Sequence, residues 1–241
     1  MRVAIVIPVR GHFGYARLAV RTALENTPDP LVILVDDASP GWRDRDWKFP
    51  AERFLLHRFK KNRGLSAAWN AGLVLARNAG AEAAVATNSD VLFPPGWWPP
   101  LEKELLPGRL LGPITNAPGH RRRQQVLRFL PDYKLTDDMK YLAKVQARLT
   151  KEQSGKLIFD RINGFCMAAR IDDWFRFACA PDTVFNPRYP MNRNEDELQG
   201  RWRKSGGKTV IVPASCVFHY RGVTRNAIRG KTGFGWYRKR K

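Results

Sequence analysis

The feature that most constrains this chain is its first apolar run. Residues Val3–Val9 are apolar at every position, and most of them are β-branched. A strand that is apolar on both faces must be covered on both faces, as a central strand of a parallel sheet is. A helical pattern over residues 15–26 and a second apolar strand over residues 31–35 follow it. This alternation predicts an α/β domain with a mostly parallel sheet flanked by helices.

The same alternation continues along the chain. We expect strands over residues 53–59, 83–86 and 110–114, a helix that ends near Asn78, a helix that begins at Thr136 and one that runs through Trp202. A chain of 241 residues with 44% hydrophobic content is enough for one α/β core and too short for two ordinary catalytic domains. We therefore expect a single domain.

The apolar runs and the cysteines indicate in which part of the cell the protein is located. No apolar run approaches the roughly 18 residues of a membrane-spanning helix, and the first run lacks a cleavage-site pattern. Cys166, Cys179 and Cys216 are odd in number and lack the Cys-x-x-Cys spacing of a zinc or redox site. We expect reduced thiols, no transmembrane segment and a cytoplasmic protein.

Positive charge is concentrated in the second half of the chain. Residues 1–110 carry 15 basic and 11 acidic residues, net +4, whereas residues 111–241 carry 27 and 11, net +16. A solubilising surface would explain many arginines but would not predict their concentration in one half. Arginine forks match phosphate oxygens, so we expect a polyanionic partner for the second half.

Polar clusters follow three of the expected strands. They are Asp36-Asp37-Ala38-Ser39, Asn62-Arg63-Gly64 and Asn88-Ser89-Asp90. The carboxyl ends of parallel strands meet at one edge of the sheet, where open α/β sheets bind their ligands. One crevice is therefore expected to hold all three clusters.

These clusters and Ile7-Pro8-Val9 resemble motifs of a known enzyme family. Together with residues 112–116, 163–167, 194–198 and 217–219 they resemble, in order, motifs of family 2 glycosyltransferases with the GT-A fold. The resemblance implies a single GT-A domain over residues 1–224, with a Rossmann-like, mostly parallel mixed sheet. Residues 1–110 would form its nucleotide-sugar half and residues 111–224 its acceptor half. Residues 225–241 would be a basic, aromatic C-terminal arm.

The resemblance also implies a site for a UDP-sugar. Its residues would be Pro8, Val9, Arg10, Asp36, Asp37, Asn62, Arg63, Asn88, Ser89 and Gly164. Asp36 and Asp37 would accept hydrogen bonds from the base or ribose. Arg10 replaces an aromatic residue that is common in the family, so stacking on uracil would pass to its guanidinium or weaken. Arg63 would reach a phosphate, and an ordinary surface arginine is the equally simple alternative.

A divalent cation, Mn²⁺ or Mg²⁺, would neutralise the leaving diphosphate. The resemblance assigns Asp90 and His219 to this cation. Asn88 stands in place of the first carboxylate of the family's Asp-x-Asp, so the metal would be held differently or more weakly. The alternative for His219 is a hydrogen-bonded histidine at a strand end.

A hydroxyl nucleophile needs a general base at neutral pH. The resemblance places the base at Asp196, and we include the adjacent Glu195 among the catalytic candidates. The alternative is an acidic first turn of a helix, which the helix dipole favours. Both descriptions can hold together.

The expected reaction is inverting transfer of a hexose, with glucose as the expected sugar, from a UDP-sugar to a hydroxyl. The charge excess suggests a hydroxymethylpyrimidine in DNA as acceptor, as in virus-encoded glucosyltransferases that work in the host cytoplasm. Acceptor contacts would come from Arg121, Arg122, Arg123, Arg225, Arg229, Lys231 and Trp236. One alternative is a peripheral glycosyltransferase for envelope or lipid-linked glycan, with its arm on an anionic membrane surface. The other is a nucleic-acid-binding GT-A protein that has lost catalysis.

Overall fold

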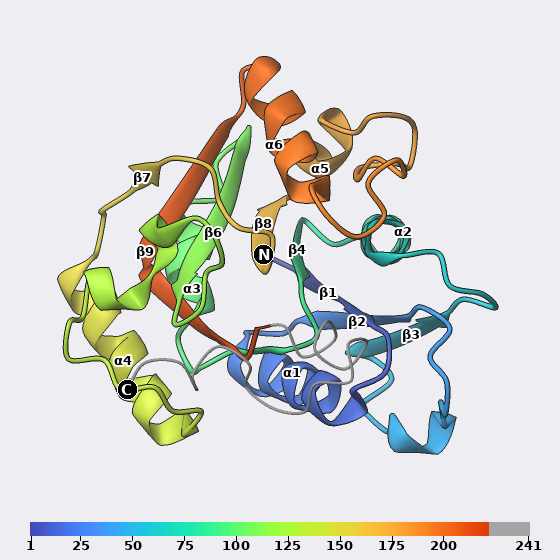
Figure 1. The fold of residues 1–241 in the computed structure, drawn as a ribbon, viewed down its shortest axis with the longest axis horizontal. Coiled ribbons are helices and arrows are strands. Elements are labelled where there is room, and N and C mark those ends of the chain that lie inside the picture. The colour runs from blue at the N-terminus through green and yellow to red at the C-terminus, as the bar shows by residue number, and fades with distance from the viewer. Residues whose placement is uncertain (222–241) are drawn as a thin grey trace.

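A mixed sheet built from both halves of the chain forms the centre of the computed structural model, which describes residues 1–221 (Figure 1). The strand order is β3-β2-β1-β4-β8-β6-β9-β5, and β7 pairs with β9. The strands are β1 (Val3–Val9), β2 (Leu31–Asp36), β3 (Phe54–Arg58), β4 (Ala83–Thr87), β5 (Val91–Leu92), β6 (Arg109–Thr115), β7 (Ile158–Phe159), β8 (Cys166–Arg170) and β9 (Lys208–His219).

Helices cover both faces of this sheet (Figure 1). They are α1 (Phe13–Asn26), α2 (Leu65–Asn78), α3 (Trp98–Lys103), α4 (Met139–Glu152), α5 (Ile171–Arg176) and α6 (Asn194–Lys204), with short 3₁₀ turns at Asp44–Asp46, Arg122–Gln124 and Val126–Arg128. None of the helices within residues 1–221 combines the length and apolar character that crossing a bilayer requires.

Strand β1 shows why its sequence is apolar throughout. Ala4 and Val6 pack in the core cluster that includes α2, whereas Val3, Ile5 and Ile7 pack in the opposite cluster that includes α1. Helix α2 approaches closely, since a Cβ on Gly72 would lie 2.1 Å from Cγ1 of Val6. The prediction of a strand covered on both faces is therefore confirmed.

The strand directions determine where the loops gather. Strands β1 to β4 are mutually parallel, β8 is antiparallel to β4 and β6, and β9 is parallel to β6. The carboxyl ends of β1, β2, β4, β6 and β9 therefore lie at one edge, together with the amino end of β8. This edge carries the predicted clusters.

The predicted elements are confirmed with shifted ends. The largest shift is in α4, which begins at Met139 rather than Thr136. The reason is local: the carboxylate of Asp138 accepts a hydrogen bond from the backbone N–H of Lys140 at 3.0 Å and caps the helix. Asp137 and Asp138 therefore precede α4 and do not lie in its first turn.

Candidate functional site

The sequence-predicted site residues within residues 1–221 come from loops and strand ends of the edge just described. In the first half of the chain, Pro8 and Val9 end β1 and Arg10 follows them, Asp36 ends β2 and Asp37 follows it, and Asn62 and Arg63 precede α2. Asn88, Ser89 and Asp90 follow β4. In the second half, Gly164 precedes β8, Glu195 and Asp196 lie in the first turn of α6, and His219 ends β9. Arg225, Arg229, Lys231 and Trp236 lie outside the described residues.

Asp36 is fully buried and already paired by the protein. Both of its carboxylate oxygens accept from the backbone N–H of Ser39, at 3.1 and 3.2 Å. The half-exposed Arg58 donates from Nε to the same carboxylate at 2.9 Å. Asp36 therefore fixes the turn after β2.

Asp37 connects two of the predicted clusters. Its Oδ1 accepts from the backbone N–H of Arg63 at 2.6 Å, and its Oδ2 accepts from that of Gly64 at 3.0 Å. Arg10 donates to the carbonyl oxygen of Asp37 at 2.6 Å, so its guanidinium lies against this turn. The side chain of Arg63 is exposed and lies over the ring of Phe59. The donor-side loops are thus held together by a buried carboxylate.

His219 and Asp90 face each other on the other side of this edge. Nε2 of His219 lies 3.2 Å from Oδ1 of Asp90 and 3.4 Å from Nδ2 of Asn88. Nδ1 of the same ring lies 3.0 Å from the carbonyl oxygen of Ala117. All three side chains are largely or partly buried.

The contact with Ala117 determines what His219 presents to Asp90. A carbonyl oxygen only accepts, so Nδ1 must carry the proton, and Nε2 of the neutral ring bears a lone pair. That lone pair and the Asp90 carboxylate converge on the same space, and two acceptors in that position require a proton or a cation between them. The pair can therefore share a proton, as a histidine–carboxylate hydrogen bond, or hold a divalent cation.

The protein supplies few ligands for such a cation. Within residues 1–221 there is no cluster of three or more His, Cys, Asp or Glu side chains suited to a metal. Mg²⁺ and its analogues commonly complete their coordination with substrate phosphates and water. The residues fit a cation that is shared with a bound diphosphate.

Neighbouring groups hold His219 in this orientation. Asn116 accepts from the backbone N–H of His219 at 2.8 Å and donates to its carbonyl oxygen at 3.1 Å. The ring of Phe165 stacks on the imidazole, with 5.3 Å between centroids. Because an oriented histidine is what both metal binding and a structural hydrogen bond need, this geometry alone serves either description of His219.

Glu195 lies against the loop that precedes β8. A Cβ on Gly164 would come within 3.0 Å of Cβ and 3.1 Å of Cγ of Glu195, so a larger residue would require the Glu195 side chain to shift. Burial raises the pKa of Glu195, and the adjacent Asp196 carboxylate raises it further, while His120 and Arg121 act in the opposite direction. A partly buried carboxyl with a raised pKa at such an edge is a functional candidate.

Asp196 forms an ion pair with Arg121, whose Nη2 donates to its Oδ1. The two side chains are 30% and 22% exposed, so solvent reaches both. Arg121 comes from the loop after β6, and its backbone is held by the Asn163 amide, which donates to its carbonyl oxygen at 3.1 Å. The predicted base and one predicted acceptor contact therefore touch each other.

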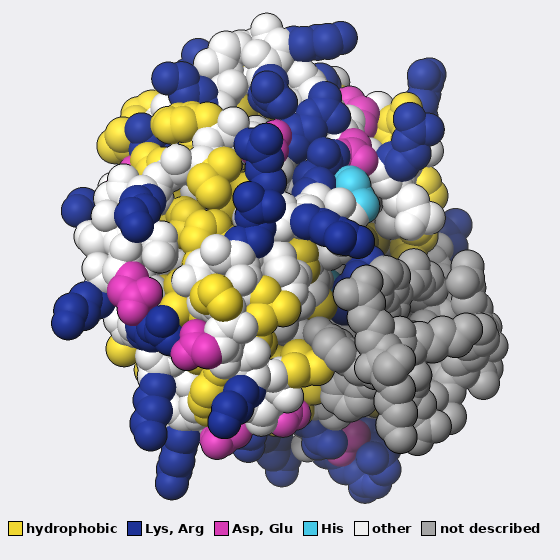
Figure 2. Space-filling model, turned by 60° about the vertical axis from the view of Figure 1, so that its left-hand side comes forward, with side chains coloured by type: hydrophobic (Ala, Val, Ile, Leu, Met, Phe, Trp, Pro, Cys, Tyr) yellow, Lys and Arg dark blue, Asp and Glu magenta, His cyan; other side chains and the backbone are white. Residues whose placement is uncertain are grey.

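The other two arginines of that loop are more exposed. Arg123 pairs with Asp160 at 3.1 Å with 59% of its side chain exposed, and Arg122 is exposed beside it. Figure 2 shows Lys and Arg side chains gathered in the upper part of one face, where they outnumber acidic ones. Two exposed arginines therefore follow Arg121, the partner of the predicted base, in the same loop.

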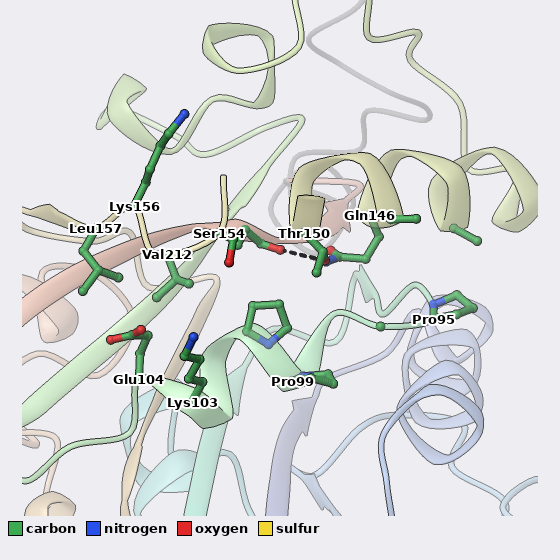
Figure 3. A pocket seen from close by; sticks show the side chains of 16 residues that line it. Pro95, Pro99, Lys103, Glu104, Gln146, Thr150, Ser154, Lys156, Leu157 and Val212 are labelled. Carbon is green, nitrogen blue, oxygen red and sulfur yellow. Dashed lines mark hydrogen bonds between the residues drawn. The ribbon is translucent and has the colours of Figure 1, made fainter. Parts of the chain in front are cut away.

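A cavity in the described part of the chain lies elsewhere. It measures about 710 Å³ and is formed by α3, α4, residues 154–157 and the middle of β9, with none of the predicted site residues in its lining (Figure 3). Gln146 in its wall donates to the carbonyl oxygen of Ala214 and to Thr150, both at 2.8 Å. The cavity and the edge of the sheet are separate features.

Sequence reasoning missed the supporting residues. Asn116 and Asn163 belong to motifs that carried the resemblance, and their amides orient His219 and the Arg121 loop. The signal that would have identified them is an asparagine directly after a buried strand or before a glycine at the ligand-binding edge. The contact of His219 with the backbone carbonyl of Ala117 could not be predicted from a pattern of side chains.

Comparisons with known proteins identify the family of the chain. Residues 4–173, more than half of the chain, match the sequence profile described as "Glycosyl transferase family 2". No curated protein matches the chain.

Several solved structures are similar. GalNAc-T7 with UDP, GalNAc and Mn²⁺ has a TM-score of 0.67 at 16% identity, over 91% of this chain and 44% of that one. The mannosyltransferase PcManGT from Pyrobaculum calidifontis with GDP-Man and Mn²⁺ has a TM-score of 0.63 at 16% identity, over 95% of this chain and 59% of that one. S. aureus TarS 1-349 with UDP has a TM-score of 0.58 at 12% identity, over 90% of this chain and 60% of that one. The chain spans 44% to 60% of these proteins, and at such identities the likeness shows the fold alone.

Proposed function

Because the chain belongs to glycosyl transferase family 2 and has the GT-A fold, we propose that it transfers a hexose from a UDP-sugar to a hydroxyl group with inversion. The observation that carries the proposal is the facing pair Asp90 and His219, which lies at the same edge of the sheet as the carboxylate of Asp196. A pair that could bind a cation and a base at one edge of the sheet are what sugar transfer from a diphosphate requires, and this supports the proposal.

The donor end is proposed at the turn after β2. Asp36 and Asp37 hold this turn and the loop of Asn62 and Arg63 in place through buried hydrogen bonds. Backbone groups of the turn and the exposed guanidinium of Arg63 are then available to the nucleotide and its phosphates. The nucleotide-sugar complexes of GalNAc-T7 and PcManGT support this class of donor, and glucose on UDP is our specific proposal.

Asp90 and His219 would hold Mn²⁺ or Mg²⁺, with Asn88 beside them. When bound, the cation supplies positive charge that stabilises the departing diphosphate. The Mn²⁺ in two of the similar structures supports a divalent cation here. Asn116 and the Ala117 carbonyl keep Nε2 of His219 directed at Asp90.

Asp196 is the proposed base. The acceptor oxygen attacks the anomeric carbon, its proton passes to the Asp196 carboxylate, and the bond from the anomeric carbon to the diphosphate oxygen breaks, so that UDP leaves with the bonding electrons. One displacement from the opposite face inverts the anomeric centre. Glu195, one residue earlier and packed on Gly164, lies next to this base.

The acceptor is proposed to be a hydroxymethylpyrimidine in DNA. The eight basic residues from Arg221 onward account for only part of the charge, because 27 less these eight leaves 19 basic against 11 acidic residues over positions 111–220. Arg122 and Arg123 extend this charge outward from Asp196. A flipped base would present its hydroxyl to Asp196 while arginines hold the backbone.

The test uses the full chain with labelled UDP-sugars, Mn²⁺ or EDTA, and three acceptors: hydroxymethylpyrimidine DNA, plain DNA and anionic liposomes with lipid-linked glycan. We expect labelled sugar on the modified DNA only, with loss of turnover in EDTA and in the Asp90→Ala variant. Binding to DNA through about six phosphates should weaken on the order of a thousandfold between 50 and 200 mM salt. Label on the glycan instead would favour the envelope enzyme, and no UDP release with any donor would favour a binding protein.

A further inference from the structure

The ion pair between Arg121 and Asp196 leaves the proposed base occupied. Nη2 of Arg121 donates to Oδ1 of Asp196, so the guanidinium sits on an oxygen that would otherwise accept the acceptor's proton. The pair joins residues 75 positions apart in the sequence. The contact engages one of the two carboxylate oxygens. Asp196 is therefore only partly available as a base until the guanidinium leaves.

The arrangement of Arg121 favours exchange. Its Nε is covered by protein and has no hydrogen-bond partner among residues 1–221, so within them the guanidinium uses its donors incompletely. An unpaired, covered N–H costs free energy, which a better acceptor would recover. The 22% exposure of the Arg121 side chain leaves a route to an incoming group.

The backbone of Arg121 is fixed independently of its side chain. Asn163 donates to the carbonyl oxygen of Arg121 and also to Oε1 of Gln124, and Gln124 in turn donates to the carbonyl oxygen of Pro113 at 2.7 Å. These contacts hold the loop whatever the guanidinium binds. The side chain can therefore exchange partners without loss of the loop.

The surroundings indicate what would compete for Arg121. Arg122 and Arg123 follow in the same short turn, so an approaching anion meets a group of cations before it meets Asp196. A phosphodiester offers two anionic oxygens to the planar fork of arginine, which matches the geometry that a guanidinium binds best. A neutral sugar hydroxyl offers no such competition.

We propose that Arg121 is a displaceable partner of the base: it occupies Asp196 while no acceptor is bound, and a phosphodiester group of the nucleic-acid acceptor draws it away, freeing Asp196. This inference rests on the proposed function. It couples activation of the base to acceptor binding and limits loss of the donor to water, since hydrolysis needs the same base to take a proton from water.

The test measures UDP release from UDP-glucose without acceptor, in full-length wild type, Arg121→Gln and Arg121→Lys. The control is Arg128→Gln, which removes one positive charge from an exposed position of the same segment. Each protein is assayed with dimethyl phosphate, plain DNA or phosphatidylglycerol vesicles, against chloride at matched ionic strength. Thermal unfolding and UDP affinity are measured alongside, to show that each variant is folded and binds the donor.

We expect dimethyl phosphate to raise UDP release by the wild type roughly two- to fivefold, the factor associated with a partly exposed ion pair. Plain DNA should do so at lower concentration. Arg121→Gln should release UDP at the raised rate without any addition, Arg121→Lys should stay near the wild-type rate, and Arg128→Gln should respond like wild type. Transfer to DNA should fall in Arg121→Gln although hydrolysis rises.

If Arg121 had a purely structural role, Arg121→Gln would not raise the rate of hydrolysis while lowering the rate of transfer. If Arg121→Gln lowers both rates together, Arg121 positions the base and the inference is wrong. Stimulation by vesicles but not by DNA overturns the nucleic-acid source. If the wild type releases no UDP and transfers no sugar under any condition, the proposed function itself fails, which is a separate result.

Discussion

Replacing Asp37 by Asn tests whether this carboxylate mainly holds the donor-side loop. Asp37 is buried, and its two oxygens accept from the backbone N–H groups of Arg63 at 2.6 Å and Gly64 at 3.0 Å. Asparagine keeps one oxygen and turns an NH₂ group toward the second N–H. One hydrogen bond is then lost, and two donors face each other in a buried position.

The size of the effect follows from these contacts. A hydrogen bond to a charged group contributes about 1.5–3 kcal/mol, and an unsatisfied buried donor costs about 1–3 kcal/mol. These two effects overlap, so we expect Asp37→Asn to lower the free energy of unfolding by about 2–4 kcal/mol. For a chain of this size each kcal/mol lowers Tm by roughly 2–4 °C, so Tm should fall by roughly 4–16 °C.

The measurement is thermal unfolding by circular dichroism without ligand, followed by titration with UDP and Mn²⁺. Asp29→Asn is the matched control, because Asp29 is exposed and its φ of 39° suits asparagine. The control should leave Tm unchanged. If Asp37→Asn also leaves Tm unchanged but abolishes UDP binding, Asp37 acts through the nucleotide and the argument from the loop is refuted.

The remaining predictions concern the base and its neighbours. Asp196→Asn should lower transfer by at least about a hundredfold with UDP affinity nearly intact, since a base acts in the transition state; equal loss of UDP binding would make Asp196 structural. Burial raises the pKa of Glu195 above its ordinary value of 4.5, so its ionised form destabilises the fold increasingly as pH rises above that value. Glu195→Gln should therefore raise Tm at pH 8 and leave it unchanged at pH 3.5, and an equal gain at both would argue against burial as the cause. Gly164→Ala should displace Glu195 and lower transfer more than UDP affinity, because the new Cβ would lie 3.0 Å from that side chain; wild-type kcat would contradict this.

The first half of the fold could be predicted from sequence because its burial is visible there. Strand β1 is covered on both faces, and that requirement appears directly as an uninterrupted apolar run. Strand β9 is the longest in the described chain and was not predicted, because Pro213 interrupts it. The pairing with β6 passes from Pro113–Val212 to Ile114–Cys216, so the proline lies in an irregularity that the ladder skips.

The site could be predicted as a set of residues but not as a set of contacts. Polar clusters after predicted strands identified Asp37 and Asp90, because the topology of a parallel sheet brings such ends together, whereas His219 was identified from the family resemblance. The pair of Arg121 with Asp196 joins a loop to the first turn of α6, and no local pattern relates the two. The orientation of His219 depends on a backbone carbonyl, which every residue possesses and which no sequence motif therefore marks.

The carboxylates at the donor end and at the acceptor end of the site are stabilised in different ways. This difference determines how substitutions at each end should affect stability and activity. At the donor end Asp36 and Asp37 are buried and satisfied by backbone N–H groups, so their charges are compensated before any ligand arrives. At the acceptor end the charge of Asp196 is compensated by a partly exposed side chain that a ligand can compete for. Changes at the donor end should therefore reduce stability together with activity, because the same hydrogen bonds hold the fold. Changes to the Arg121–Asp196 pair should alter how hydrolysis and transfer are balanced while Tm stays nearly constant, because a partly exposed ion pair contributes little to folding.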